Sequence, residues 1–302
     1  MFEGLAWAYP HLAANLQSEV KTFLANEWGK HPPFSKSAWY ALKEGERREL
    51  FWTPDEVRSR LGQDKPHYAF GNLHSVWFYA ERCGEWAQVL EAWPQIKAGF
   101  DDFAKTGWRL DSAKGDLHAN RYLASLLAFA RIAERAKDVA SAERAGALAS
   151  ETGEALAAWW KRAAAGGTLT NFKGSSELDP FIGQGDALSF RVAPHRHKVA
   201  LFRDLTPEVA WILRAKASEA VATVWSTFET LYATWPYVGE ERQVHFGENF
   251  VDPPDLALSA FETLAWLRNA TRDELARRID LPFCRADLSY VTKLVVALEA
   301  GD

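Results

Sequence analysis

Apolar residues recur at three- and four-residue spacing through most of the chain, the pattern typical of amphipathic α-helices. The clearest case is residues 118–137, where a single stripe holds Leu123, Leu126, Leu127, Ala130 and Ala133. The alanine-rich residues 140–165 predict a second long helix after a very short turn. We expect the stripe, with Leu123, Leu127 and Ala130 among its members, to face the core.

Turn and capping residues divide the rest of the chain into further helices. Thr53–Glu56 and Thr271–Glu274 have the spacing of helix N-terminal capping sequences. The predicted helices cover residues 10–28, 71–83, 85–106, 207–216, 218–235, 255–268, 271–279 and 286–300. Pro94 either bends the third of these helices or restarts it. In the last helix Leu288, Val291, Val295 and Leu298 share one face, and we expect the last three of them to be core residues.

The predicted class is all-α, with about twelve helices. Several helices are joined by turns of one to four residues, so neighbours must be antiparallel. No linker interrupts residues 1–302, which predicts one domain. No repeat of fixed period is found, so a closed α/α toroid is favoured over an open solenoid. Weak strand signals at residues 168–172 and 187–192 allow for a small β-hairpin in a loop.

Composition excludes several classes of protein. The chain of 302 residues has a net charge of −5 and no basic run, so nucleic acid is not an expected partner. No stretch of about 20 apolar residues is present, so we expect no membrane span. Residues 1–10 lack the pattern of a signal peptide, and a cytoplasmic location is the default expectation. Cys83 and Cys284 show no zinc-ligand spacing and are expected to be buried; no metal or cofactor is predicted.

Tryptophan is unusually frequent, with 14 residues against one methionine. Most of these rings are expected to pack between helices, and some are candidate stacking platforms for sugar rings. The loop residues Trp108 and Trp235 are better candidate platforms than Trp225, which lies within a helix, and Trp77 and Trp108 are the candidates for substrate binding.

One segment resembles a known superfamily. Residues 74–86 contain Tyr79-Ala80 and Gly84-Glu85-Trp86, and Trp93-Pro94-Gln-Ile-Lys97 follows. This run looks like a helix hairpin of the six-hairpin glycosidase superfamily, and residues 120–134 are similar to the opening helix of the next hairpin. The resemblance covers residues 70–165. It implies an α/α toroid and a place among glycoside hydrolases, phosphorylases, sugar epimerases and polysaccharide lyases, but it assigns no catalytic residue.

Two long polar loops, residues 174–198 and 240–255, carry the candidate catalytic groups. Glycoside hydrolysis needs a protonated acid and a base or nucleophile on opposite sides of the bond. Glu177 or Asp179 from the first loop and Glu248 from the second could provide this pair across a central funnel. We therefore expect both loops at the same face. Asp116 and Asp252 are instead expected to cap the helices that follow them.

Further polar residues are candidates for substrate binding: His195, Arg196, His197, His245, His118, Arg121 and Tyr122. The pair His195 and His197 has a spacing that would suit a metal, but sugar hydrogen bonding or packing is favoured. His118, Arg121 and Tyr122, together with Asn120, are residue types that polysaccharide lyases on similar toroids use to neutralise a uronate and remove its C5 proton.

The sequence therefore favours a carbohydrate-active enzyme of the glycoside hydrolase type, acting on an oligo- or polysaccharide. A polysaccharide lyase or sugar epimerase on the same fold is the first alternative. A non-catalytic helical domain that binds glycan or protein is the second. The sequence leaves the oligomeric state open.

Overall fold

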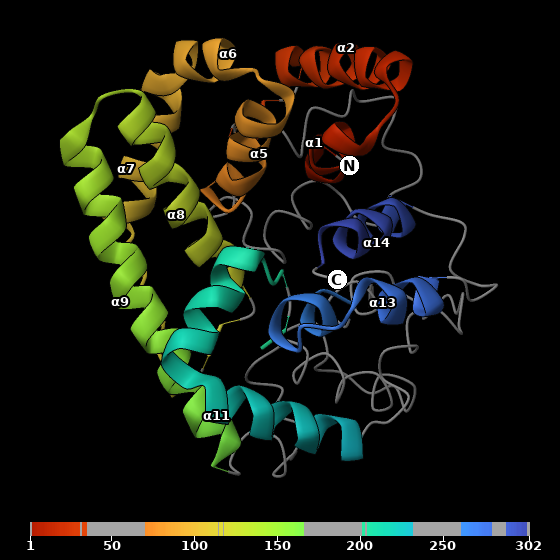
Figure 1. Cartoon of the computed structure of the whole chain (residues 1–302). Coiled ribbons are helices and arrows are strands. Elements are labelled where there is room, and N and C mark those ends of the chain that lie inside the picture. Colours follow the sequence, from red (N-terminus) through yellow and green to blue (C-terminus); the bar gives the residue numbers. More distant parts are fainter. Residues whose placement is uncertain are drawn as a thin grey trace, which may run out of the picture. The chain divides into compact units, whose positions relative to one another are not determined.

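A computed structural model describes residues 2–30, 32–34, 70–113, 115–116, 118–165, 201–202, 204–231, 261–279 and 288–300 (Figure 1). Every regular element in these ranges is a helix, which confirms the all-α class. The predicted strands at residues 168–172 and 187–192 lie outside the described ranges, and closure into a toroid stays a prediction. No helix in the described part of the chain has the length and apolarity needed to cross a membrane.

The chain forms two compact units, and each is described by itself. Unit 1 consists of residues 1–109 and 124–149, and unit 2 of residues 110–123 and 150–302. Two long helices run from one unit into the other: α8 (Ala119–Arg135) and α9 (Val139–Ala164).

Unit 1 begins with a helix that the sequence pattern did not predict. This is α1 (Phe2–Ala8), which continues through the 3-10 turn η1 (Tyr9–His11) to α2 (Ala14–Lys30). The helix predicted from Pro10 therefore begins at Ala14, because Pro10 belongs to η1. Trp7 packs on Phe78 with ring centroids 5.5 Å apart, so α1 is held against the next described helix, α5 (Leu73–Cys83).

The segment that carries the family resemblance forms a helix–turn–helix. Helix α5 ends at Gly84, which has φ 75° and ψ 19°, a left-handed conformation that glycine adopts without steric cost. Helices α6 (Trp86–Glu91) and α7 (Trp93–Lys105) follow. Pro94 lies in the first turn of α7, where its missing N–H is not needed. It therefore restarts the helix, which was one of the two predicted outcomes.

Other residues of this segment also have structural roles. The Tyr79 hydroxyl donates to Gln88 Oε1 at 2.7 Å, and its ring stacks on Trp28. Burial raises the pKa of Tyr79, which keeps this phenol protonated and able to donate. Burial also raises the pKa of Cys83 to about 12, as expected for a cysteine in the core. Cys284 lies outside the described residues.

A tight turn joins α8 to α9. Lys137 has φ 61°, and the Asp138 N–H donates to the Ala133 carbonyl at 2.9 Å, a bond that closes the end of α8. Asp138 then caps α9, because its Oδ1 accepts the Ser141 N–H at 3.1 Å. A connection this short reverses the chain, so the end of α8 and the start of α9 form an antiparallel hairpin (Figure 1).

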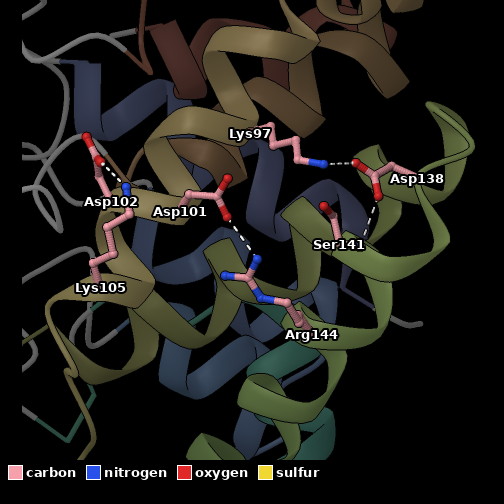
Figure 2. Close-up of polar contacts among 7 residues, drawn as sticks. All are labelled: Lys97, Asp101, Asp102, Lys105, Asp138, Ser141 and Arg144. Atoms are coloured by element: carbon pink, nitrogen blue, oxygen red, sulfur yellow. Dashed lines mark hydrogen bonds and ion pairs between the residues drawn. The ribbon is translucent and has the colours of Figure 1, made fainter.

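Ion pairs link α7 to the start of α9 (Figure 2). Lys97 Nζ lies 2.5 Å from Asp138 Oδ2, and Arg144 Nη1 lies 2.9 Å from Asp101 Oδ1. The Arg144 guanidinium also lies 4.9 Å from the centre of the Phe100 ring. Asp138 therefore both caps α9 and forms an ion pair with α7, so one side chain stabilises the start of α9 and its contact with α7.

The predicted stripe of α8 is only partly correct. Leu123, Leu126 and Ala133 are buried, whereas Leu127 and Ala130 are partly exposed. The most enclosed face includes Phe129, whose ring stacks on Phe100 at 4.1 Å and on Trp93 at 5.3 Å. This aromatic contact turns the helix so that the edge of the stripe with Leu127 and Ala130 faces away from the centre of the core.

Unit 2 contains α11 (Pro207–Leu231), the π-helix η5 (Thr263–Leu267), α13 (Arg272–Ile279) and α14 (Leu288–Glu299). Helix α11 is interrupted at Ala217, with φ −147° and ψ 29°. This confirms the break predicted between residues 216 and 218. Part of the core of unit 2 is a set of edge-on aromatic contacts. The centroid of the Phe202 ring lies 5.3 Å from that of Trp160 and 6.0 Å from that of Trp225.

The capping sequence of α13 is confirmed. Thr271 N–H donates to Glu274 Oε2 at 2.8 Å, and Glu274 N–H donates to Thr271 Oγ1 at 3.3 Å, which is the reciprocal pattern of a capping box. These bonds lower the pKa of Glu274, since both the backbone and the hydroxyl of Thr271 donate to its carboxylate.

The predicted core face of α14 is wrong in part. Val295 is buried, but Val291 is only half-buried and Leu298 is 46% exposed. The buried face instead follows Lys293, Val296, Ala297 and Ala300. A lysine in the middle of that face hides it from a hydrophobicity pattern, although a long aliphatic stem can be buried like an apolar side chain.

We predict that Leu126→Ala lowers the free energy of unfolding by about 2–5 kcal/mol, because it removes fully buried carbons and leaves a cavity. Leu127→Ala is the matched control, since it makes the same change one residue along at a half-buried site. It should cost clearly less. Chemical denaturation measures both values, and an equal loss would contradict the orientation of α8.

We also predict that Asp138 makes stability depend on pH. The hydrogen bond from Lys97 and the backbone N–H of Ser141 lower the pKa of Asp138 below its ordinary value of 3.8. A lowered folded-state pKa stabilises the protein above the unfolded value, and this contribution is lost as pH falls through the folded value. Asp138→Asn should therefore be less stable than the wild type at pH 7, and the difference should shrink below about pH 4.

The control for this experiment is Glu91→Gln, which removes an exposed carboxylate with no ion pair among the described residues. It should leave the pH dependence of unfolding unchanged. A gap between Asp138→Asn and wild type that stays constant from pH 7 to about pH 3 would show that the charge of Asp138 does not act as described.

Candidate functional site

The described candidate residues fall in two places. His118, Arg121 and Tyr122 lie at the start of α8 in unit 2, and Trp77 and Trp108 lie in unit 1. The other candidates lie outside the described residues: Glu177, Asp179, Glu248, His195, Arg196, His197 and His245. The expectation that the two long loops meet at one face stays a prediction for the same reason.

The loop before α8 is built from two aspartate turns. Asp111 Oδ1 accepts the Ala113 N–H at 2.8 Å, and the Asp111 carbonyl accepts the Gly115 N–H at 2.8 Å. Asp116 Oδ1 accepts the His118 N–H at 2.8 Å. Asp116 therefore caps α8, as predicted, and both carboxylates shape the backbone locally.

Gly115 fixes this loop against the second half of α9. It has φ 74°, and a Cβ added there would lie 2.2 Å from Cζ2 of the buried Trp159. No residue with a side chain fits at that distance, and the left-handed backbone disfavours one as well. The loop can approach the indole of Trp159 only because position 115 is glycine.

The polar residues of the first turn of α8 have different roles. Asn120 is 1% exposed and its Nδ2 donates to the Leu201 carbonyl at 3.0 Å, so it positions the backbone of residues 201–202. His118 and Tyr122 are one turn apart, with ring centroids at 5.8 Å. Tyr122 is buried, while His118 and Arg121 are half-buried. The turn therefore presents an imidazole and a guanidinium beside a buried phenol.

The His118 imidazole and the Arg121 guanidinium could take part in proton transfer and in binding an acidic group. An imidazole can accept or donate a proton near neutral pH, and a guanidinium can pair with a carboxylate through two parallel hydrogen bonds. They lie on a helix whose start is fixed by Asp116 and by the packing of Gly115. Side chains on a rigid helix are held in position more precisely than side chains on a loop.

The two candidate tryptophans of unit 1 each make a contact within that unit. The Arg131 guanidinium carbon lies 4.2 Å from the centre of the Trp77 ring, so one face of this half-buried indole is already covered. Trp108 is half-buried, and its ring lies 5.7 Å from Phe103. Both rings make packing contacts in unit 1, and their role in substrate binding stays a prediction.

The sequence pattern missed a pocket in unit 2. Its volume is 280 Å³, and Arg214, Trp266 and Asn269 are among its lining residues. Trp211, 65% exposed, lies three residues before Arg214 on α11. The spacing of Pro207, Trp211 and Arg214 on one helix face was the available signal. It was not informative alone, because a tryptophan inside a helix is ordinarily expected to pack in a core.

Among the described residues no group of three or more His, Cys, Asp or Glu side chains is placed to hold a metal ion. Comparisons with protein-family models, with curated proteins and with solved structures give no match for this chain.

We predict that Gly115→Ala destabilises the protein more than Gly107→Ala. Both glycines have a left-handed backbone conformation, with φ 74° at Gly115 and 67° at Gly107, but a Cβ at position 107 would meet no atom within 4 Å. The second variant therefore measures the backbone cost alone, roughly 1–2 kcal/mol. Gly115→Ala adds the collision with Trp159, worth about 1–3 kcal/mol more. Denaturation midpoints give both values, and equal losses would mean that the loop does not contact Trp159.

Proposed function

We propose that the chain is a carbohydrate-active enzyme of the glycoside hydrolase type, which cleaves an oligo- or polysaccharide. One observation supports the proposal most directly. The residues that resemble a helix hairpin of the six-hairpin glycosidases are helical over α5, α6 and α7, with Gly84 left-handed after α5 and Pro94 in the first turn of α7, which is compatible with the resemblance. The all-helical architecture of the described ranges is compatible with that scaffold.

The chemistry is assigned to a pair of carboxylates from Glu177, Asp179 and Glu248. One of them must stay protonated near neutral pH to donate to the leaving oxygen, and another must be ionised to activate water or attack the sugar. The environment of each carboxylate decides which role it takes, because a buried or negatively charged surrounding raises the pKa.

The experiment is a screen of neutral and acidic polysaccharides with products analysed by mass, repeated with Glu177→Gln, Asp179→Asn and Glu248→Gln. Removal of the acid or the base should lower turnover at least about a hundredfold. Substrate binding should change little, because the amide keeps the shape of the carboxyl group. Glu241→Gln is the matched control, since it neutralises a carboxylate of the second loop that has no proposed role.

A polysaccharide lyase is the second candidate, and the contact between His118 and Tyr122 beside Arg121 favours it. Its products would carry an unsaturated uronate that absorbs in the near ultraviolet. Tyr122→Phe would then abolish activity while keeping the buried ring, and the three carboxylate variants would stay active. That pair of results would contradict the hydrolase proposal. Glycan binding without turnover of any substrate would contradict both enzymes and support the non-catalytic alternative.

A further inference from the structure

The pocket in unit 2 is lined by two polar residues, Arg214 and Asn269, and otherwise by residues with mainly apolar side chains. Helix α11 provides Pro207 and Arg214, η5 provides Trp266, and the turn after η5 provides Asn269. Ala300, the residue after α14, also lines the pocket. A volume of 280 Å³ is close to the lower end of the range for small-molecule sites, which corresponds to a ligand of about one ring.

The two polar lining residues are held in place by the turn after η5. Asn269 has φ 50°, a left-handed conformation that asparagine tolerates better than most residues. Backbone bonds close the turn, from Arg268 N–H to the Thr263 carbonyl at 3.1 Å and from Ala270 N–H to the Leu264 carbonyl at 2.9 Å. The Asn269 side-chain oxygen accepts a hydrogen bond from Arg214 Nη1. The turn therefore orients the guanidinium.

Most of the N–H donors of the Arg214 guanidinium remain available to a ligand. A guanidinium has five N–H groups, and in the described part of the chain the only partner of Arg214 is the neutral amide of Asn269. No carboxylate there neutralises its charge. An oriented guanidinium that faces a pocket and has no acidic partner within the described ranges matches the geometry of a ligand carboxylate, which it can bind through two parallel hydrogen bonds.

The remaining walls suit a flat or weakly polar ring. Trp266 is 9% exposed and borders the pocket together with Pro207 and small alanines. On the same face of α11, Trp211 exposes 65% of its surface between Pro207 and Arg214. Trp211 does not line the pocket, but an exposed indole on that helix face is a surface on which a sugar or an aromatic ring can stack.

We propose that this pocket binds a small ring compound that carries one carboxylate. The carboxylate pairs with Arg214, and the ring lies against Pro207 and Trp266. A ligand with one negative charge matches the pocket better than a ligand with two, because Arg214 is the only charged residue among the described ones that line the pocket. The ring can come from a sugar acid or from a non-sugar acid. The proposal does not depend on the hydrolase assignment, whose candidate carboxylates lie on other segments.

The test is isothermal titration of the full chain with glucuronate, glucose, benzoate and inorganic phosphate. Saturable binding is expected for glucuronate or benzoate and not for glucose. Binding of glucuronate alone identifies a sugar acid as the ligand class, and binding of benzoate alone identifies a non-sugar acid. Failure of both acids to bind would overturn the proposal, and so would phosphate binding as tightly as either acid.

Variants assign the binding to the pocket. Arg214→Gln should weaken binding of the acid at least about tenfold, the loss expected for a charge-assisted hydrogen bond. Arg214→Lys, which keeps the charge but not the planar fork, should restore affinity only in part. Arg277→Gln is the matched control, since it makes the identical change at an exposed residue of α13 that does not line the pocket. Equal losses in Arg214→Gln and Arg277→Gln would show non-specific attraction and overturn the proposal.

Discussion

The enclosure of α8 from residue 124 on is the constraint on which the rest of unit 1 depends. From Tyr122 to Ala133 most of its side chains are buried. The Ser125 hydroxyl donates to the Gly71 carbonyl at 2.9 Å, just before α5 begins. Phe129 stacks on two rings of α7. A helix enclosed on several faces fixes its neighbours, because each of them must fit the same set of side chains.

The candidate chemistry at the start of α8 is supported by contacts within unit 2. His118 and Arg121 lie beside Asn120 and Tyr122, which are buried, and the Asn120 side chain donates to the Leu201 carbonyl. Asp116 and Gly115 fix the loop before them, the first by capping and the second by its approach to Trp159. Side chains on such a support lose little further freedom when a ligand binds, which is the advantage of a preorganised site.

The sequence predicted the features that depend on local rules. These include the helical class, the break at Ala217, the capping box at Thr271 and the cap at Asp116, because each follows from spacing or backbone chemistry. The orientation of helices was less predictable, since it depends on tertiary contacts. Lys293 is buried and Leu298 is exposed, a reversal that no hydrophobicity pattern expects. The pocket at Arg214 was missed because the turn at Asn269 and α11 are far apart in sequence.

Native-state hydrogen exchange tests the central role of α8 most directly. In α8 most side chains are buried, whereas in α2 only Leu24 and Trp28 are buried. Amides that open only in global unfolding exchange most slowly, and amides of weakly packed helices exchange through local opening. We expect the amides of residues 122–133 to be in the slowest class and those of α2 to exchange much faster. Protection of α2 equal to or above that of α8 would contradict this expectation.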